Sequence, residues 1–106
     1  MESHVVLSRL LDLYGAFLTE RQRTLLTQSV NEDFSLSEIA ELEGISRQGV
    51  RDALKRAQTQ LEDMESKLGL LKITDRLQAL KAELEAQGAS EALVCMADEL
   101  LDLSGG

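Results

Sequence analysis

The stretch that decides the fold is Leu18–Leu70, which reads LTERQRTLLTQSVNEDFSLSEIAELEGISRQGVRDALKRAQTQLEDMESKLGL. Near its centre, Ser35 and Glu38 have the spacing of a capping box, in which a hydroxyl and a carboxylate three residues later satisfy backbone donors at a helix start. The helix that begins there should end by residue 43, because Gly44 can adopt the left-handed conformation that commonly follows a helix. This pattern predicts a short helix over about Leu36–Glu43.

A second helix follows after a very short turn. Ser46 is placed to cap it, so that it begins at Arg47. Ile45 can fill the space between the two helices. Two helices joined by three or four residues that include a glycine are typical of a helix-turn-helix motif. The sequence therefore predicts this motif in the middle of the chain.

The second helix of the motif continues beyond the usual length. Its apolar residues alternate at spacings of four and three, which is a heptad seam; they are Val50, Leu54, Ala57, Leu61, Met64, Leu68 and Leu71. Such a seam either packs against the first helix of the same chain or is shared with a second copy in a homodimer. Gly69 lies near its end, and the sequence leaves open whether the helix breaks there.

Apolar periodicity predicts further helices on both sides of the motif. Val5–Leu18 carries a broad apolar stripe, and Thr19 forms a capping box with Gln22 for the helix that follows. On the other side, one helix is expected over about Leu70–Ala86. Ser90 caps a last helix, whose apolar face should consist of Leu93, Met96, Ala97, Leu100 and Leu101.

The chain as a whole should be helical. No segment shows the alternation with period two that indicates a strand, and 106 residues is the length of one domain. We therefore predict an all-α fold in a single helical domain, residues 1–106. The helix-turn-helix core lies at about 19–66 and the C-terminal helices at about 70–103.

The candidate binding residues lie on the outer side of the helix that starts at Arg47. Four of the eleven basic residues of the chain fall between positions 47 and 56. If the seam points inward, the residues that point outward or flank that face are Arg47, Gln48, Arg51, Lys55 and Arg56. In a helix-turn-helix the first turns of this helix contact base edges, with Arg suited to guanine and Gln to adenine. A solvated basic face is the alternative.

Acidic residues surround this basic face. The net charge of the chain is −8, whereas a nucleic-acid binder usually carries a basic patch. Asp52 lies at the centre of the face, and Glu38, Glu41 and Glu43 lie on the preceding helix. These carboxylates would oppose a DNA backbone, which favours a protein or ribonucleoprotein partner.

The sequence holds no set of residues that indicates catalysis. It has no nucleophile paired with a base, no Gly-rich phosphate loop and no metal-ligand cluster, so we predict no enzymatic activity, no metal and no cofactor. Cys95 is the only cysteine, and we expect it on a buried helix face. Glu62, Asp63 and Glu65 should be solvated. No apolar run approaches a membrane span and no signal-peptide layout is visible, so we expect a cytoplasmic protein.

Several motifs resemble known proteins. The segments Thr19–Arg23, Ser35–Ala40 and Gly44–Gln48 follow the pattern of the helix-turn-helix of sigma-factor region 4. Together with Asn31–Phe34 and Leu61–Gly69, they are similar to the YlxM family of small bacterial proteins. The resemblance covers about residues 10–70.

This resemblance implies a non-enzymatic regulatory protein of the signal recognition particle pathway, which binds the protein or the RNA of that particle. The sequence departs from the family pattern at Gly49 and Arg51, where Ala and an aromatic residue are expected, and at Ser29, where Tyr is more usual. The other reading is a DNA-binding transcription regulator that uses the helix from Arg47.

Overall fold

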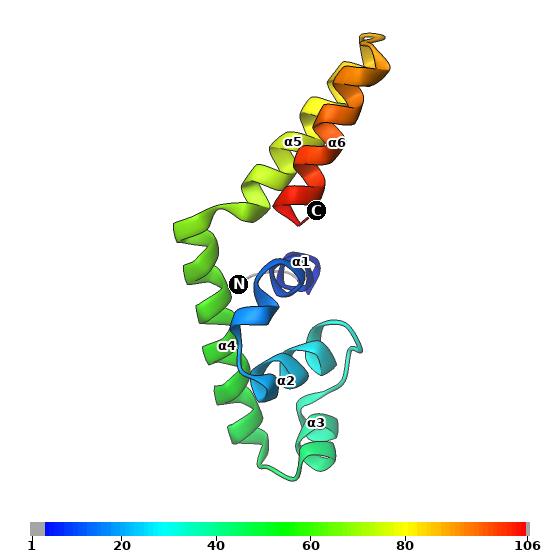
Figure 1. The fold of residues 1–106 in the computed structure, drawn as a ribbon. Coiled ribbons are helices and arrows are strands. Elements are labelled where there is room, and N and C mark those ends of the chain that lie inside the picture. The colour runs from blue at the N-terminus through cyan, green and yellow to red at the C-terminus, as the bar shows by residue number, and fades with distance from the viewer. Residues whose placement is uncertain (1–3, 106) are drawn as a thin grey trace. The chain divides into compact units, whose positions relative to one another are not determined.

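The computed structural model describes residues 4–105, and across that range it contains helices and no strand. Six α-helices follow one another along the chain (Figure 1). They are α1 (His4–Tyr14), α2 (Glu20–Val30), α3 (Leu36–Glu43), α4 (Arg47–Leu68), α5 (Leu70–Ala86) and α6 (Glu91–Ser104). A short 3-10 helix, η1 (Gly15–Phe17), follows α1. The predicted all-α class is confirmed.

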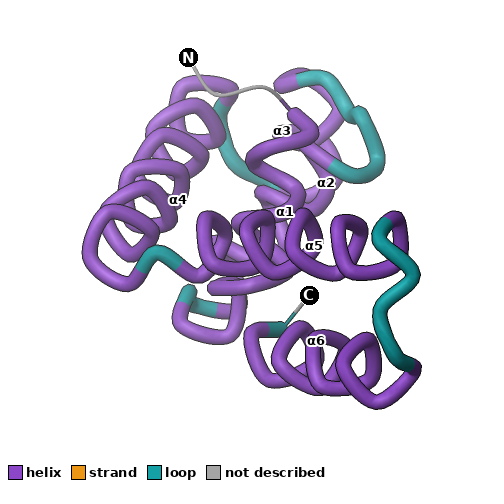
Figure 2. The backbone as a smooth tube through the Cα atoms, turned by 90° about the horizontal axis from the view of Figure 1, so that it is seen from above, coloured by secondary structure: helices purple, strands orange, loops and turns teal. Residues whose placement is uncertain are grey.

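The chain divides after Lys67 into two compact units. Helices α1 to α3 and nearly all of α4 form unit 1, and α5 and α6 form unit 2, where they pack side by side (Figure 2). That residues 1–106 fold as a single domain stays a prediction.

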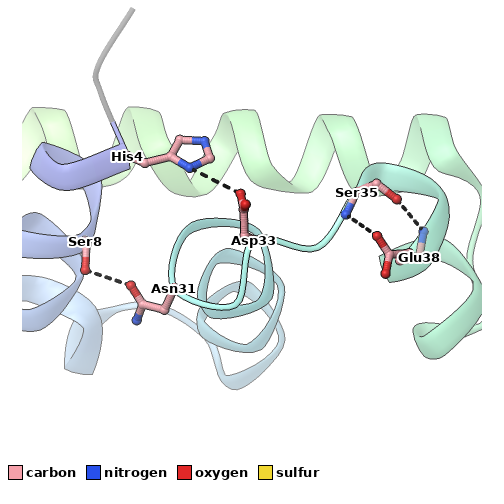
Figure 3. A network of polar contacts seen from close by, with 6 residues as sticks. All are labelled: His4, Ser8, Asn31, Asp33, Ser35 and Glu38. Carbon is pink, nitrogen blue, oxygen red and sulfur yellow. Dashed lines mark hydrogen bonds and ion pairs between the residues drawn. The ribbon is translucent and has the colours of Figure 1, made fainter.

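Capping boxes begin α2 and α3, as predicted. At α3, the backbone N–H of Ser35 donates to Glu38 Oε1 at 3.1 Å, and the backbone N–H of Glu38 donates to Ser35 Oγ at 3.1 Å (Figure 3). Thr19 and Gln22 make the same reciprocal pair at the start of α2. Each box satisfies two backbone donors that would otherwise lack a partner.

The turn of the helix-turn-helix motif has the predicted chemistry. Gly44 adopts the left-handed conformation with φ of 68°, which ends α3. Ser46 Oγ accepts a hydrogen bond from the backbone N–H of Gly49 at 2.9 Å and so caps α4. The motif is held by a buried cluster, against which Phe34, Leu36, Ile45, Ala53 and Leu54 pack; the cluster comprises Leu25, Ile39, Ala40 and Val50.

The first helix ends earlier than predicted. The helix expected to reach Leu18 stops at Tyr14, and Gly15–Phe17 form a 3-10 turn. The backbone of Leu18 is extended, which aligns the chain with the cap of α2. The apolar periodicity concealed this break because Leu18 is buried even though it lies outside the helix, whereas Phe17 is 70% exposed.

Contacts from α1 hold unit 1 together. Ser8 Oγ donates to Asn31 Oδ1 at 2.7 Å, so α1 is bound to the loop after α2 (Figure 3). Tyr14 is fully buried, and its hydroxyl donates to Glu65 Oε1 at 2.8 Å. Glu65 is thus part-buried and connects α4 to α1, and the expectation that it is solvated was wrong.

The heptad seam of α4 is largely filled within the chain. Val50, Ala57 and Leu61 are completely buried, and Leu54 and Met64 are half-buried. Leu68 is 57% exposed. Three central positions are therefore not available to a second copy, which favours the intramolecular alternative over a homodimer through this seam.

Helix α4 breaks at Gly69. This residue has φ of 67°, in the left-handed region where a side chain is unfavourable. The break falls between Leu68, the last residue of α4, and Leu70, the first of α5. A single glycine therefore separates the two helices.

Unit 2 is an antiparallel helix pair. Thr74 and Ser104 share a hydrogen bond of 3.0 Å between their hydroxyls, and Lys81 Nζ lies 2.6 Å from Asp98 Oδ1. The predicted apolar face of α6 is only partly buried: Ala97 and Leu101 are buried, whereas the large side chains Leu93, Met96 and Leu100 are about half exposed. Cys95 is also exposed, so its expected buried position was wrong.

Candidate functional site

The candidate site is the outer face of the N-terminal half of α4. Ser46 fixes where this helix starts, and the buried Val50 fixes its rotation. As a result, all five residues proposed from the sequence are exposed; they are Arg47, Gln48, Arg51, Lys55 and Arg56. We refer to these five residues as the α4 face. Their role in binding stays a prediction.

One member of the α4 face already has a partner. The Gln48 amide donates to Asp52 Oδ1 at 2.9 Å, one helical turn along. Both side chains are exposed, so releasing this hydrogen bond to a ligand would cost little. Asp52 is therefore directed toward Gln48, although its negative charge remains on the face.

The acidic residues of α3 are arranged unequally. Glu43 is turned toward α2, where its carboxylate accepts from the Gln28 amide at 3.1 Å and lies 4.0 Å from Arg21. The carboxylate of Glu38 closes the capping box with Ser35. Glu41 is exposed. Two of the three carboxylates thus stabilise the motif itself, so fewer of them oppose a ligand on the α4 face than the sequence suggested.

A groove between α3 and α4 adjoins the α4 face. Its volume is about 410 Å³, and it is lined by Leu36, Arg51, Leu54, Lys55, Gln58, Thr59 and Glu62. Leu36 and Leu54 are half-buried and form an apolar part of the lining, while Arg51 and Lys55 supply positive charge. Such a lining suits a partner that offers apolar side chains next to acidic ones.

Sequence reasoning missed this groove. It treated Leu54 as an inward seam residue and Leu36 as the first residue of a helix. Both do pack against the buried cluster, and both also remain accessible at the groove. Their position at the junction of two helices was the available signal, because side chains at such a junction are seldom covered completely.

The described residues offer little evidence for other chemistry. Between residues 4 and 105, no group of three His, Cys, Asp or Glu side chains is arranged to hold a metal ion. No helix in that same range combines the length and hydropathy needed to cross a membrane. The α4 face and its groove are therefore the candidate site.

Comparisons with known proteins give a consistent result. A model of the UPF0122 family, described as YlxM / p13 like and helix-turn-helix, matches residues 1–98. A UPF0122 protein of Clostridium perfringens (strain SM101) is 44% identical over 87 residues, which cover 82% of this chain and 78% of that protein. A UPF0122 protein of Halalkalibacterium halodurans is 42% identical over 95 residues, which cover 86% of this chain and 87% of that protein.

Proposed function

Since the chain belongs to the UPF0122 family of YlxM / p13-like helix-turn-helix proteins, we propose that it is a non-enzymatic regulator of the signal recognition particle pathway. It acts by binding the protein or the RNA of that particle through the α4 face. The pathway is taken from the resemblance to YlxM described above, and the binding surface from the geometry of α4.

The observation that carries the proposal is the α4 face itself. Four exposed basic side chains lie within ten residues of one helix, on a chain whose net charge is −8. They adjoin a groove that is partly apolar. RNA, or an acidic segment of the particle's protein, would be attracted to the α4 face.

Binding to the purified components of the particle tests this proposal. Titrations of the labelled protein with the particle's protein and with its RNA should each be measured for the wild type and for Arg51→Glu. Arg51 is exposed and lines the groove, so the substitution should leave the fold intact and weaken binding at least about tenfold, which is roughly 1.4 kcal/mol.

Lys67→Glu is the matched control. Lys67 is exposed on the same helix and pairs with Asp63 at the surface, at 2.9 Å, an interaction that contributes little to stability. It should bind like the wild type. If neither component binds the wild-type protein, or if both charge reversals weaken binding equally, the proposal is wrong.

A second candidate is a DNA-binding transcription regulator. It is favoured by Arg47, Gln48 and Arg51, which are exposed in the first turns of α4, where a helix-turn-helix reads base edges. The pairing of Glu43 with Arg21 and Gln28 also removes one carboxylate from the approach of a DNA backbone.

Duplex binding distinguishes the two candidates. Asp52 and the exposed Glu41 limit the number of phosphate contacts, so we expect weak, non-specific binding at about 0.15 M salt, with a shallow dependence on salt. Tight binding to one DNA sequence, lost in Arg51→Glu and kept in Lys67→Glu, would instead support the transcription regulator.

A further inference from the structure

Unit 2 exposes an apolar surface on both of its helices. On α5, Ile73 and Leu80 are 46% and 48% exposed, and on α6 the exposed fractions run from 47% to 83% for Leu93, Met96, Leu100 and Leu103. We call these six side chains the hairpin face. A soluble protein rarely leaves so many large apolar residues together in water unless they bind a partner.

Helix geometry places all six residues on the same side of the helix pair. Successive residues of an α-helix are rotated by about 100°. Ile73 and Leu80 each precede a residue that contacts α6, namely Thr74 and Lys81. The side chains of Ile73 and Leu80 therefore point about 100° away from the side of α5 that contacts α6, and both are rotated in the same direction around the helix axis.

The same relation holds on α6. Met96 and Leu100 each precede a buried residue, Ala97 and Leu101, and are turned from the contact line in the same sense. Because Thr74 pairs with Ser104 and Lys81 with Asp98, the two helices run antiparallel. In an antiparallel pair, the residues that precede the contact residues on one helix lie on the same side of the pair as the residues that precede the contact residues on the other helix. The hairpin face is thus a continuous surface across both helices.

We propose that this surface is a homodimer interface, in which the hairpin faces of two copies form an antiparallel four-helix bundle. Spacings of three and four along Leu93, Met96, Leu100 and Leu103 are those of helices that pack in such bundles. This interface is separate from the α4 seam, whose central residues are already buried in the single chain.

The distribution of charge identifies a second copy as the occupant. Helix α6 carries four acidic residues, Glu91, Asp98, Glu99 and Asp102, and no basic one. Helix α5 carries three basic and three acidic residues and is neutral overall, and its exposed Arg76 is one of the basic residues. The unit therefore presents an acidic helix beside a neutral helix that carries an exposed arginine, and a copy of itself is complementary when α6 lies on α5.

This complementarity also selects the symmetry. A two-fold axis parallel to the helices places α5 of each copy against α6 of the other, at the same level along the bundle. Arg76, on the outer edge of the α5 stripe, then comes within about one helical turn of Glu99 of the partner subunit. A perpendicular axis would instead place the acidic α6 of one copy on the acidic α6 of the other, which is unfavourable.

Sedimentation of the full chain over a wide range of concentrations tests the proposal. The wild type should show a monomer–dimer equilibrium. Leu100→Glu, which places a charge in the hairpin face, should raise the dissociation constant at least about tenfold. Leu103→Glu provides a second variant if Leu100→Glu fails to fold, because Leu103 is already 83% exposed.

Leu42→Glu is the matched control, since Leu42 is 60% exposed on α3 and lies outside the hairpin face. It should dimerise like the wild type. A wild type that stays monomeric at all concentrations, or a Leu42→Glu variant that dissociates as readily as Leu100→Glu, would overturn the proposal.

A charge exchange tests the arrangement of the two copies. Arg76→Glu and Glu99→Arg should each weaken the dimer, and the double variant should recover most of the lost affinity because each pair is then reversed. Two single variants with wild-type affinity, or a double variant that is weaker than both, would rule out the packing of α5 on α6. Circular dichroism checks that every variant keeps the helical content of the wild type.

Discussion

Ser35 contributes to the helix-turn-helix through two hydrogen bonds, one from its hydroxyl and one from its backbone. Its Oγ accepts from the Glu38 N–H, and its own N–H is satisfied by the Glu38 carboxylate. Both bonds lie at the surface, so water can replace them in part. The loss of a capping hydroxyl typically lowers helix or protein stability by about 1 kcal/mol.

We therefore expect Ser35→Ala to lower the free energy of unfolding by about 1 kcal/mol, as measured by urea denaturation. Ser37→Ala is the control, because Ser37 is exposed two residues later on the same helix and does not cap it. It should change stability by less than about 0.5 kcal/mol. Equal effects of both substitutions would show that the capping box does not stabilise α3.

Short sequence patterns predicted where helices begin better than they predicted which side chains contact one another. The caps at Thr19, Ser35, Ser46 and Ser90 were all predicted correctly, because each depends on residues three positions apart. The pairing of Glu43 with Gln28 could not be predicted, since it joins two helices. The exposed position of Cys95 was missed because α6 buries a narrower face than its apolar residues suggested.

Helix α4 combines an inner seam with an outer basic face, and the two can be tested separately. The seam residue Leu61 is completely buried, whereas Leu68 is 57% exposed near the end of the same helix. The heptad pattern assigned both residues to one seam. Leu68 is the last residue of α4 and falls outside unit 1, whose core encloses Leu61, and periodicity alone does not reveal this boundary.

Leu61→Ala should lower the free energy of unfolding by roughly 2–5 kcal/mol, because it leaves a cavity in a closed part of the core. Leu68→Ala makes the same chemical change at an exposed position and should cost less than about 1 kcal/mol. Thermal or urea unfolding measures both. A loss below about 1 kcal/mol for Leu61→Ala would mean that the seam is not a core position.

The helix pair of unit 2 contains a pH-dependent contact. The hydrogen bond from Lys81 to Asp98 raises the pKa of Lys81, and the charges of Asp98, Glu85 and Asp102 add to this effect against a smaller opposing effect of desolvation. Because the pKa of this lysine is raised in the folded state, the contact makes its full contribution to the stability of the folded state at any pH below the ordinary lysine pKa of about 10.4. The stabilisation is lost as pH rises through the folded-state pKa.

The stability difference between wild type and Lys81→Gln should accordingly be constant near neutral pH and shrink above about pH 10.4. Unfolding free energies measured across this range give the difference directly. Lys67→Gln controls for the loss of one lysine, as Lys67 pairs with Asp63 at an exposed site. A difference that stays constant through the alkaline range would contradict the assignment.

At the scale of the whole molecule, the chain consists of two compact units, which can unfold together or one after the other. The sequence predicted one domain from its length, but length does not report how cooperatively α1–α4 and the α5–α6 pair unfold. Each unit happens to carry a unique probe. Tyr14 is the only tyrosine and is buried in unit 1, and Cys95 is the only cysteine and is exposed in unit 2.

We expect the fluorescence of Tyr14 and that of a dye on Cys95 to report the same urea midpoint, as a single cooperative domain requires. Both signals should be recorded at one protein concentration. Separate midpoints would show that residues 1–106 comprise two domains. The Leu61→Ala variant separates the two outcomes further. If the chain is a single domain, the substitution should shift both midpoints, and if it comprises two domains, it should shift only the Tyr14 midpoint.

The joint at Gly69 has a consequence for how the protein is degraded. A protease needs several residues of extended, accessible chain, and such sites concentrate in exposed loops. Here helix continues on both sides of one glycine, so the joint offers no such stretch. The loops between α2 and α3 and between α5 and α6 are better substrates. Proteases in a cell would therefore seldom separate the helix-turn-helix from the C-terminal helix pair by cleavage at Gly69. The two parts would then be degraded at the same rate.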